Sequence, residues 1–210
     1  AGGSAIVNMS PQIAAQSLTS TERSLLLHAI DVAMDAGADY ADGRVIRTQF
    51  EAIGTREQTI TQVQSTDSFG INVRALVGGS WGFSASQILS RDAIAEMARE
   101  AVRIAAANNA VAPSTTTLAP VDIYPDADWV TPHSIDPFDV PLEDKAALLL
   151  RTNAEAMRVN NIRFASSSIL SVREERLVAT SEGSLIKQTF YRINPSVNIT
   201  AISADGSDFQ

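Results

Sequence analysis

The hydrophobic and polar positions of residues 69–86, FGINVRALVGGSWGFSAS, predict two paired strands. Apolar side chains occupy every second position from Ile71 to Val77, and this period of two is that of a strand. Gly78 and Gly79 follow, and glycine readily adopts the positive φ angles that a two-residue hairpin turn requires. We therefore predict that the chain turns back at once into an aromatic strand over residues 80–86.

The segment before this hairpin has the pattern of one helix and further strands. Thr19 and Glu22 form a capping box, and Gly37 suits the position just after a helix, so a helix is predicted over about residues 20–36. Strands are then predicted near 43–53, 58–65, 70–77 and 80–86, with polar breaks at 55–58 and 65–68. Together these segments predict a meander.

Two more helices follow. Ser90 is a favourable cap for a helix from Arg91 to about residue 108, whose small apolar residues lie on one stripe. Pro141 begins another helix, with acidic residues in its first turn, that ends near residues 160–161. Beyond it, residues 181–184 are the predicted turn of a second hairpin.

Between these helices, residues 110–141 have a different composition. Six of the eight prolines and five aspartates lie there. A connection of this length without secondary structure is unusual inside a compact domain. We predict a crossover that wraps the surface or joins two lobes, held in place by Tyr124 and Trp129.

The two halves of the chain resemble each other. Residues 25–27 match 148–150 at an offset of 123, and residues 71–76 match 197–202 at an offset of 126. The fold class predicted is α+β, with helices packed on mostly antiparallel meander sheets in two repeated helix-plus-meander units. The predicted division of the chain is a mobile arm (1–17), a first α+β unit (18–109), the crossover (110–140) and a second unit (141–210) that is truncated at its carboxy end.

Composition narrows the class of function. With 210 residues, 45% of them hydrophobic, the chain can bury the core of one large or two small domains. No apolar run reaches the ~18 to 20 residues that span a bilayer, and a net charge of −8 opposes binding to a nucleic-acid backbone. We expect neither a membrane nor a nucleic acid as partner. A cytoplasmic location is expected, with an exported bacterial protein as the alternative.

The sequence contains few residues that are suited to catalysis or to metal binding. Two histidines, His28 and His133, and no cysteine cannot supply the ligands of a zinc site, so no metal, cofactor or catalytic residue is assigned to this chain. Asp35, Asp39 and Asp42 surround a helix end and are interpreted as solvated caps. Glu174 and Glu175, which lie between two arginines in the sequence, are interpreted as an exposed strand turn.

Four residues of the first hairpin are the candidates for contact with a substrate or a subunit: Arg74, Trp81, Gly82 and Phe83. Arg74 lies on an otherwise apolar strand, where a guanidinium either forms a structural salt bridge or contacts a partner. Trp81 and Phe83 beside Gly82 are either core residues or an aromatic edge onto which an extended peptide can add as a strand.

Residues 69–86 also resemble, in residue identity and order, a region near the amino terminus of the TldD/PmbA proteins, which has Gly-x-x-Val-Arg followed by Gly-x-x-x-Gly-Phe. This is the "modulator of gyrase" family of metalloproteases, and the resemblance is greater to its TldD branch. Residues 37–42 are similar to the family's first helix-to-strand junction, and residues 136–145 to its entry into a later helix. Roughly residues 20–205 follow the family pattern.

The resemblance implies the non-catalytic amino-terminal region of a zinc metallopeptidase that cuts extended or unfolded peptides. The family's zinc motif, His-Glu-x-x-x-His, lies in its carboxy-terminal half and is not in this chain, so zinc is expected only in the full-length parent. Family members form homodimers or pair with a PmbA-type subunit, and this region is expected to shape the substrate cavity and the subunit contacts. Two alternatives stay open: a PmbA-like, zinc-free partner subunit, and an acidic module for peptide binding or assembly.

Overall fold

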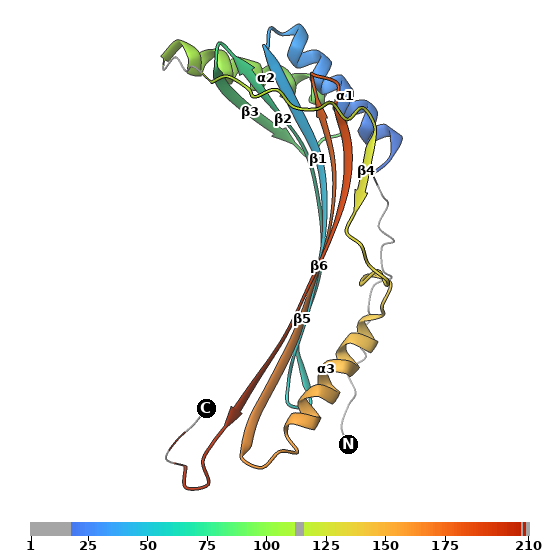
Figure 1. Cartoon of the computed structure of the whole chain (residues 1–210), viewed down its shortest axis with the longest axis vertical. Helices are drawn as coiled ribbons and strands as arrows, with labels where there is room; N and C mark the ends of the chain where they lie inside the picture. The colour runs from blue at the N-terminus through green and yellow to red at the C-terminus, as the bar shows by residue number, and fades with distance from the viewer. Residues whose placement is uncertain (1–17, 112–115, 207, 209–210) are drawn as a thin grey trace.

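The structure is dominated by one curved sheet of very long strands, with helices on its outer side (Figure 1). The computed structural model describes residues 18–111, 116–206 and 208, so the predicted arm at 1–17 lies outside the described residues. The elements in chain order are α1 (Ser20–Asp35), β1 (Tyr40–Arg56), β2 (Thr59–Val77), β3 (Ser80–Ser86), α2 (Arg91–Val111), β4 (Ala127–Val130), α3 (Leu142–Ala156), β5 (Ile162–Thr180) and β6 (Leu185–Ala201).

The strands form a six-stranded sheet in the order β3-β2-β1-β5-β6-β4. Every neighbouring pair is antiparallel except β4 and β6, which run parallel. This arrangement confirms the predicted α+β class with a mostly antiparallel sheet. Both halves of the chain contribute to this sheet, since β1 and β5 lie side by side at its centre.

The predicted polar break at residues 65–68 is wrong. The strand β2 continues through it for 19 residues, and Ser65 and Ser68 are paired with residues of β1. All of β2 from Thr59 to Ser68 is exposed, because this part of the strand is an edge: β3 pairs only with residues 71–77. Polar residues are well suited to such an edge strand, so their presence does not end it.

The sheet has one face that the helices cover and one that they do not. Successive side chains of a strand point to opposite faces, and Val45 and Ile53 of β1 point into the cores under the helices. Even-numbered residues of β1 and β5, and their partners on the other strands, point the other way. We call this helix-free side the concave face, because the sheet curves around it (Figure 1).

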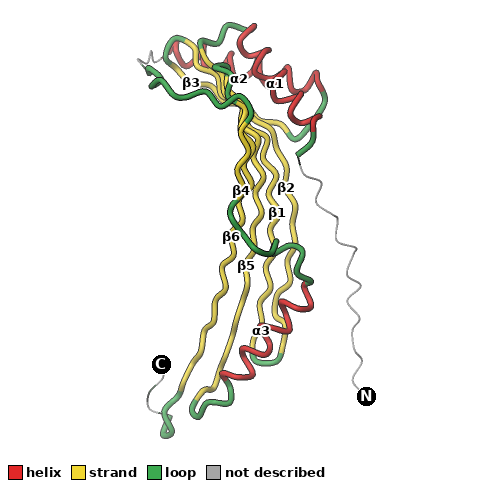
Figure 2. The backbone as a smooth tube through the Cα atoms, turned by 45° about the vertical axis from the view of Figure 1, so that its right-hand side comes forward, coloured by secondary structure: helices red, strands yellow, loops and turns green. Residues whose placement is uncertain are grey.

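The helices lie along different parts of the covered face. Figure 2 shows α1 and α2 against the upper end of the sheet and α3 along its lower half. The capping box of Thr19 and Glu22 is present at the start of α1, as predicted. The sheet passes close under α1 at Gly43: a Cβ there would lie 2.8 Å from Leu26 Cδ1 and 3.1 Å from the Asn72 carbonyl oxygen. At the other end, Leu149 of α3 packs with Ile53.

The proline-rich crossover has structure of its own. The helix α2 extends to Val111, and β4 joins the sheet beside β6. Both predicted anchors make contacts: the backbone of Tyr124 exchanges hydrogen bonds with Ser184 and Leu185, and Trp129 lies 5.1 Å from the Phe190 ring, centroid to centroid.

A helix followed by a long hairpin occurs in each half of the chain, as α1-β1-β2 and as α3-β5-β6. The turn predicted at residues 181–184 does connect β5 to β6. This shared order does not test whether the halves arose by duplication, so the repeat stays a prediction, as do the domain boundaries.

Candidate functional site

Three of the four residues selected from the sequence share the upper part of the concave face. In the antiparallel register, Arg74 of β2 is paired with Phe83 of β3, and the next pair on the same face, two residues along, is Leu76 with Trp81. The Arg74 guanidinium carbon lies 4.8 Å from the centroid of the Trp81 ring, and the Tyr40 ring meets that indole edge-on at 6.0 Å. Phe83 is 54% exposed. The interpretation of Phe83 as a core residue is therefore wrong.

Arg74 forms the structural salt bridge that was one of its two interpretations. Its Nη2 donates to Asp42 Oδ2 at 2.6 Å, and its Nε donates to Oδ1 at 3.1 Å. The hydrogen bond to Asp42 raises the pKa of Arg74. Asp42 is only 2% exposed, so its interpretation as a solvated cap is wrong: it lies inside β1, where strand pairing sets its partner.

Gly82 points to the opposite face. A Cβ at this position would lie 2.0 Å from the Ala101 oxygen and 2.4 Å from the Ala105 nitrogen. The glycine therefore allows the backbone of α2 to pack directly on β3. Asn108 of the same helix donates a hydrogen bond to the Trp81 carbonyl at 2.9 Å, which adds to this contact. The geometry gives Gly82 a packing role.

A hollow lies beside this group on the concave face. Its volume is about 480 Å³, and its lining residues come from β1, β5 and β6: Arg44, Ile46, Arg176, Val178, Ile186 and Gln188. Sequence reasoning missed all six, because β1 lies more than 100 residues before β5 and β6 in the chain. Only the strand register brings Arg44 opposite Val178 and beside Arg176.

Below the hollow, arginines and aromatic rings lie together. The guanidinium carbons of Arg176 and Arg192 lie 4.9 and 5.9 Å from the Phe190 centroid, and both arginines form ion pairs with Glu174. Residues 174–175 are therefore not an exposed turn, as the sequence suggested, but the middle of β5. Glu175 points to the covered face and is buried.

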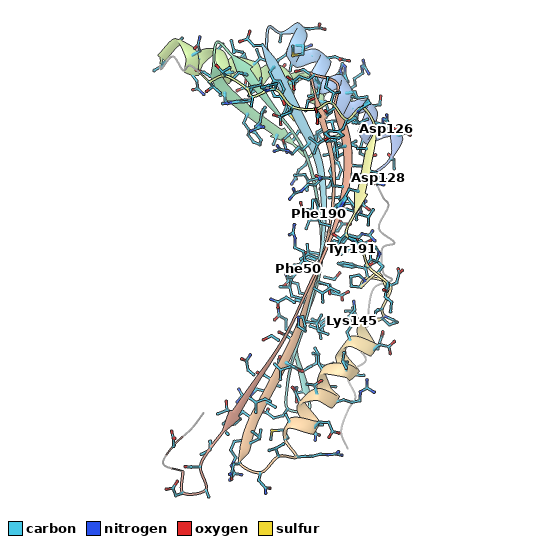
Figure 3. All side chains as sticks on the ribbon, in the orientation of Figure 1. Phe50, Asp126, Asp128, Lys145, Phe190 and Tyr191 are labelled. Carbon is cyan, nitrogen blue, oxygen red and sulfur yellow. The ribbon has the colours of Figure 1, made fainter. Side chains whose placement is uncertain are left out.

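The labelled side chains in Figure 3 show the two faces at this level of the sheet. Phe50 and Phe190 lie on the side away from α3, and Tyr191 and Lys145 lie on the side of α3. Phe190 and Tyr191 are neighbours in β6, so the change of face follows from the alternation of side chains along a strand.

The concave face carries an excess of positive charge. At the regularly paired strand positions, the charged side chains that point to this face are five arginines and two carboxylates: Arg44, Arg56, Arg74, Arg176 and Arg192, with Asp42 and Glu174. The chain as a whole has a net charge of −8. The acidic residues thus lie mainly elsewhere, and the concave face differs in sign from the rest of the protein.

On the covered face, an ionic cluster fixes the segment before α3. Asp136 accepts hydrogen bonds from the Phe138 N–H (2.8 Å), from the Tyr191 hydroxyl (2.7 Å) and from Arg173 (3.3 Å). Burial opposes ionisation of Asp136, but these bonds outweigh it and lower its pKa. Burial, and then the bond to Asp136, raises the pKa of Tyr191 to about 12.

A buried ion pair lies nearby, between Lys145 of α3 and Glu51 of β1, which are 6% and 4% exposed. Its role is positional, since it holds the first turn of α3 on the sheet. The predicted start of this helix at Pro141 is confirmed, because Pro141 is its N-cap residue.

Neither histidine belongs to a metal site that the structure can identify. His133 Nδ1 lies 2.7 Å from the Thr131 carbonyl oxygen, and its ring lies tilted against the Tyr191 ring, 4.4 Å between centroids. His28 is half-buried on α1. In the part of the chain that the structure describes, no three His, Cys, Asp or Glu residues are grouped so as to bind a metal ion. None of the described helices has the length and apolar character of a membrane span.

Comparison with known proteins identifies two family domains. Residues 41–105 match the model of PmbA/TldA metallopeptidase domain 1, and residues 135–210 match the model of the PmbA/TldA metallopeptidase central domain. Together the two matches cover more than half of the chain.

Curated proteins named as metalloproteases are similar in sequence. One from Methanocaldococcus jannaschii is 28% identical over 177 residues, which is 84% of this chain and 39% of that protein. One from Synechocystis is 26% identical over 180 residues, 82% of this chain and 36% of that protein. The chain thus spans less than half the length of these relatives.

Solved structures share the fold. A protein of Bacteroides thetaiotaomicron described as a modulator of DNA gyrase superposes with a TM-score of 0.69 at 14% identity, over 90% of this chain and 43% of that one. TldE from Thermococcus kodakarensis superposes with a TM-score of 0.60 at 14% identity, over 90% of this chain and 41% of that one.

Proposed function

Because this chain belongs to the PmbA/TldD metallopeptidase family, we propose that it is the amino-terminal region of a TldD-like zinc metallopeptidase that acts on extended or unfolded peptides. Its own role is non-catalytic. The concave face lines the cavity that receives the peptide, and the first hairpin contributes to subunit contacts.

The concave face is the observation that supports this role best. It is free of helices, it contains a hollow of about 480 Å³, and aromatic rings such as Phe83 and Trp129 are exposed on it. The side chains of an extended peptide point alternately to two sides, so a surface that binds such a peptide must be long and must offer pockets for every second side chain. The strands of this sheet, up to 19 residues long, offer such a surface.

The catalytic metal is assigned to the remainder of the full-length protein. A catalytic zinc normally takes three protein ligands, and the described residues offer no such group. When bound, zinc activates a water molecule and polarises the peptide carbonyl. The residues of this chain bind and orient the peptide, and no proton transfer is assigned to them.

The outer edge of β3 is the proposed subunit contact. Among the described strands, only β2 pairs with β3, so its other edge can accept a strand from another chain. Phe83 projects beside this edge with more than half of its surface exposed. A homodimer, or a pair with a PmbA-type subunit, can form here.

The test uses the purified full-length protein and unfolded casein. We expect cleavage that stops with EDTA and returns with added zinc. Cleavage that continues unchanged in EDTA contradicts the metallopeptidase assignment. A full-length protein that holds no zinc, and that cleaves only when a second subunit is added, identifies the PmbA-like alternative instead.

A matched pair of variants tests the role of the hairpin. Phe83→Ala is expected to raise the KM for casein or to weaken subunit association, without a change in thermal stability. Leu148→Ala removes a side chain that is similarly exposed, at 49%, but lies on α3, so it should change neither. Equal behaviour of the two variants would argue against a contact at β3.

A further inference from the structure

The carboxylates on the concave face are fewer than its arginines, so they do not neutralise its positive charge. Two carboxylates are shared by four of these arginines: Asp42 pairs with Arg44 and Arg74, and Glu174 pairs with Arg176 and Arg192. The fifth, Arg56, pairs with Glu57 at the far end of β1. Arginine is the side chain that best recognises a carboxylate, because its planar fork donates two parallel hydrogen bonds. The charge of this face is therefore complementary to an anionic ligand.

We propose that the hollow between Arg44 and Arg176 binds carboxylate groups of extended peptides, so that this face selects acidic segments or free carboxyl termini. The inference rests on the proposed function, because it names the class of peptide that the same face receives. Arg44 of β1 and Arg176 of β5 lie on adjacent strands and both line the hollow.

The ion pairs on this face leave donor capacity for a ligand. Asp42 accepts its close hydrogen bonds from Arg74, and Arg44 approaches it only at 3.7 Å with 39% of its side chain exposed. Glu174 is shared between Arg176 and Arg192. Each arginine has five N–H donors, so one carboxylate shared by two arginines does not use all of them.

The remaining lining favours a peptide over a small anion. Ile46, Val178 and Ile186 form an apolar wall, and Gln188 adds a side-chain amide. Apolar surroundings strengthen an ion pair with a bound carboxylate, because they lower the local dielectric constant. Next to the hollow, the rings of Phe190 and Trp129 can contact the apolar residue that precedes or follows the acidic one.

The test measures fluorescence anisotropy of labelled peptides with the full-length protein, kept in EDTA so that the peptides are not cleaved. The first probe is an amidated peptide Gly-Val-Glu-Thr-Glu-Val-Gly, the second has Gln in place of Glu, and the third is the Gln peptide with a free carboxyl terminus. At about 50 mM salt we expect the Glu peptide to bind about ten-fold more tightly than the amidated Gln peptide, because charge-assisted hydrogen bonds are stronger than neutral ones. The salt concentration is kept low because salt screens the attraction between the charges. The third probe shows whether a terminal carboxylate is sufficient.

Substitutions then locate the site. Arg44→Gln and Arg176→Gln should each abolish most of the preference for Glu, whereas Arg44→Lys should keep part of it. Arg99→Gln, on the helix layer, removes a similarly exposed arginine that pairs with Glu96 and should leave the preference intact. Circular dichroism confirms that each variant is folded.

The outcomes separate this inference from the proposed function. Equal binding of the Glu and Gln peptides overturns the carboxylate preference but leaves peptide capture in place. Binding of no peptide contradicts both. A single-stranded oligothymidine that binds more tightly than the Glu peptide assigns the face to phosphate chains and also overturns the inference.

Discussion

Arg74 on β2 binds both carboxylate oxygens of Asp42 on β1, and the same guanidinium lies over the ring of Trp81 on β3. One side chain therefore connects three neighbouring strands on the concave face. Asp42 is almost fully buried, and a buried carboxylate is stable only while a cation and hydrogen bonds compensate it.

We expect Arg74→Gln to lower the free energy of unfolding by about 3 kcal/mol, because it leaves the buried Asp42 without its main partner. Urea denaturation followed by circular dichroism measures this change. The double variant Asp42→Asn, Arg74→Gln should be less destabilised than the sum of the single variants, since the two residues interact. Additive effects would mean that the pair contributes no coupling.

Gly82→Ala is expected to destabilise the protein by about 3 kcal/mol or more, because overpacking against backbone atoms cannot be relieved by a side-chain rotation. The new Cβ would lie 2.0 Å from a carbonyl oxygen of α2. Gly70→Ala is the matched control: its Cβ would have its nearest neighbour at 3.9 Å. Similar melting temperatures for the two variants would contradict close packing of α2 on β3.

Lys145→Met should cost about 3 to 5 kcal/mol, because it leaves the buried Glu51 carboxylate uncompensated. Replacing both partners, with Lys145→Met and Glu51→Leu together, should recover much of this loss. Arg151→Met removes an exposed charge from the same helix and should have little effect. If the double variant unfolds as easily as the single one, then the apolar pair does not pack in this site.

Tyr191→Phe should change the pH dependence of stability. The folded-state pKa of Tyr191 is raised from 10.0 to about 12, so the unfolded chain loses this proton first, and stability falls as the pH rises from about 10 to about 12. The variant lacks this alkaline loss. Tyr124→Phe, at an exposed ring, is the control.

The same variant should respond differently to acid. The pKa of Asp136 is lowered below its ordinary value of 3.8, so its contribution is present above that pH and is lost as the pH falls through the folded-state pKa. Without the Tyr191 hydroxyl the pKa is lowered less, and the loss should be smaller. Urea titrations near pH 3, 7 and 11 measure the loss of stability in acid and in alkali. Identical curves for Tyr191→Phe and the native protein would show that the hydroxyl is not coupled to Asp136.

The sequence was sufficient for features that depend on neighbouring residues. The capping box at Thr19 and the helix start at Pro141 were both predicted, because a helix end is satisfied by residues within one turn. The hairpin at Gly78 and Gly79 was predicted for a similar reason, since positive φ angles are a property of the glycines themselves. The α+β class followed from the order of these elements.

Features that join distant segments were not predictable. Asp42 and residues 174–175 were interpreted as solvated, yet Asp42 is buried and the acidic pair lies within β5. The polar residues 65–68 were interpreted as a break, although an exposed edge strand accepts them. In each case the environment of the residue depends on which strand lies beside it, and local composition does not specify this.

What the sequence by itself determined is the three helices, the hairpin turns and the order of most strands, together with the resemblance to the family. The tertiary structure alone decided which side chains share a face. Arg44 and Arg176 are more than 100 residues apart, and the antiparallel register of β1 and β5 places both on the concave face. A shift of one residue in that register would move one of them to the helices, because side chains alternate along a strand. The candidate site therefore exists only through strand pairing.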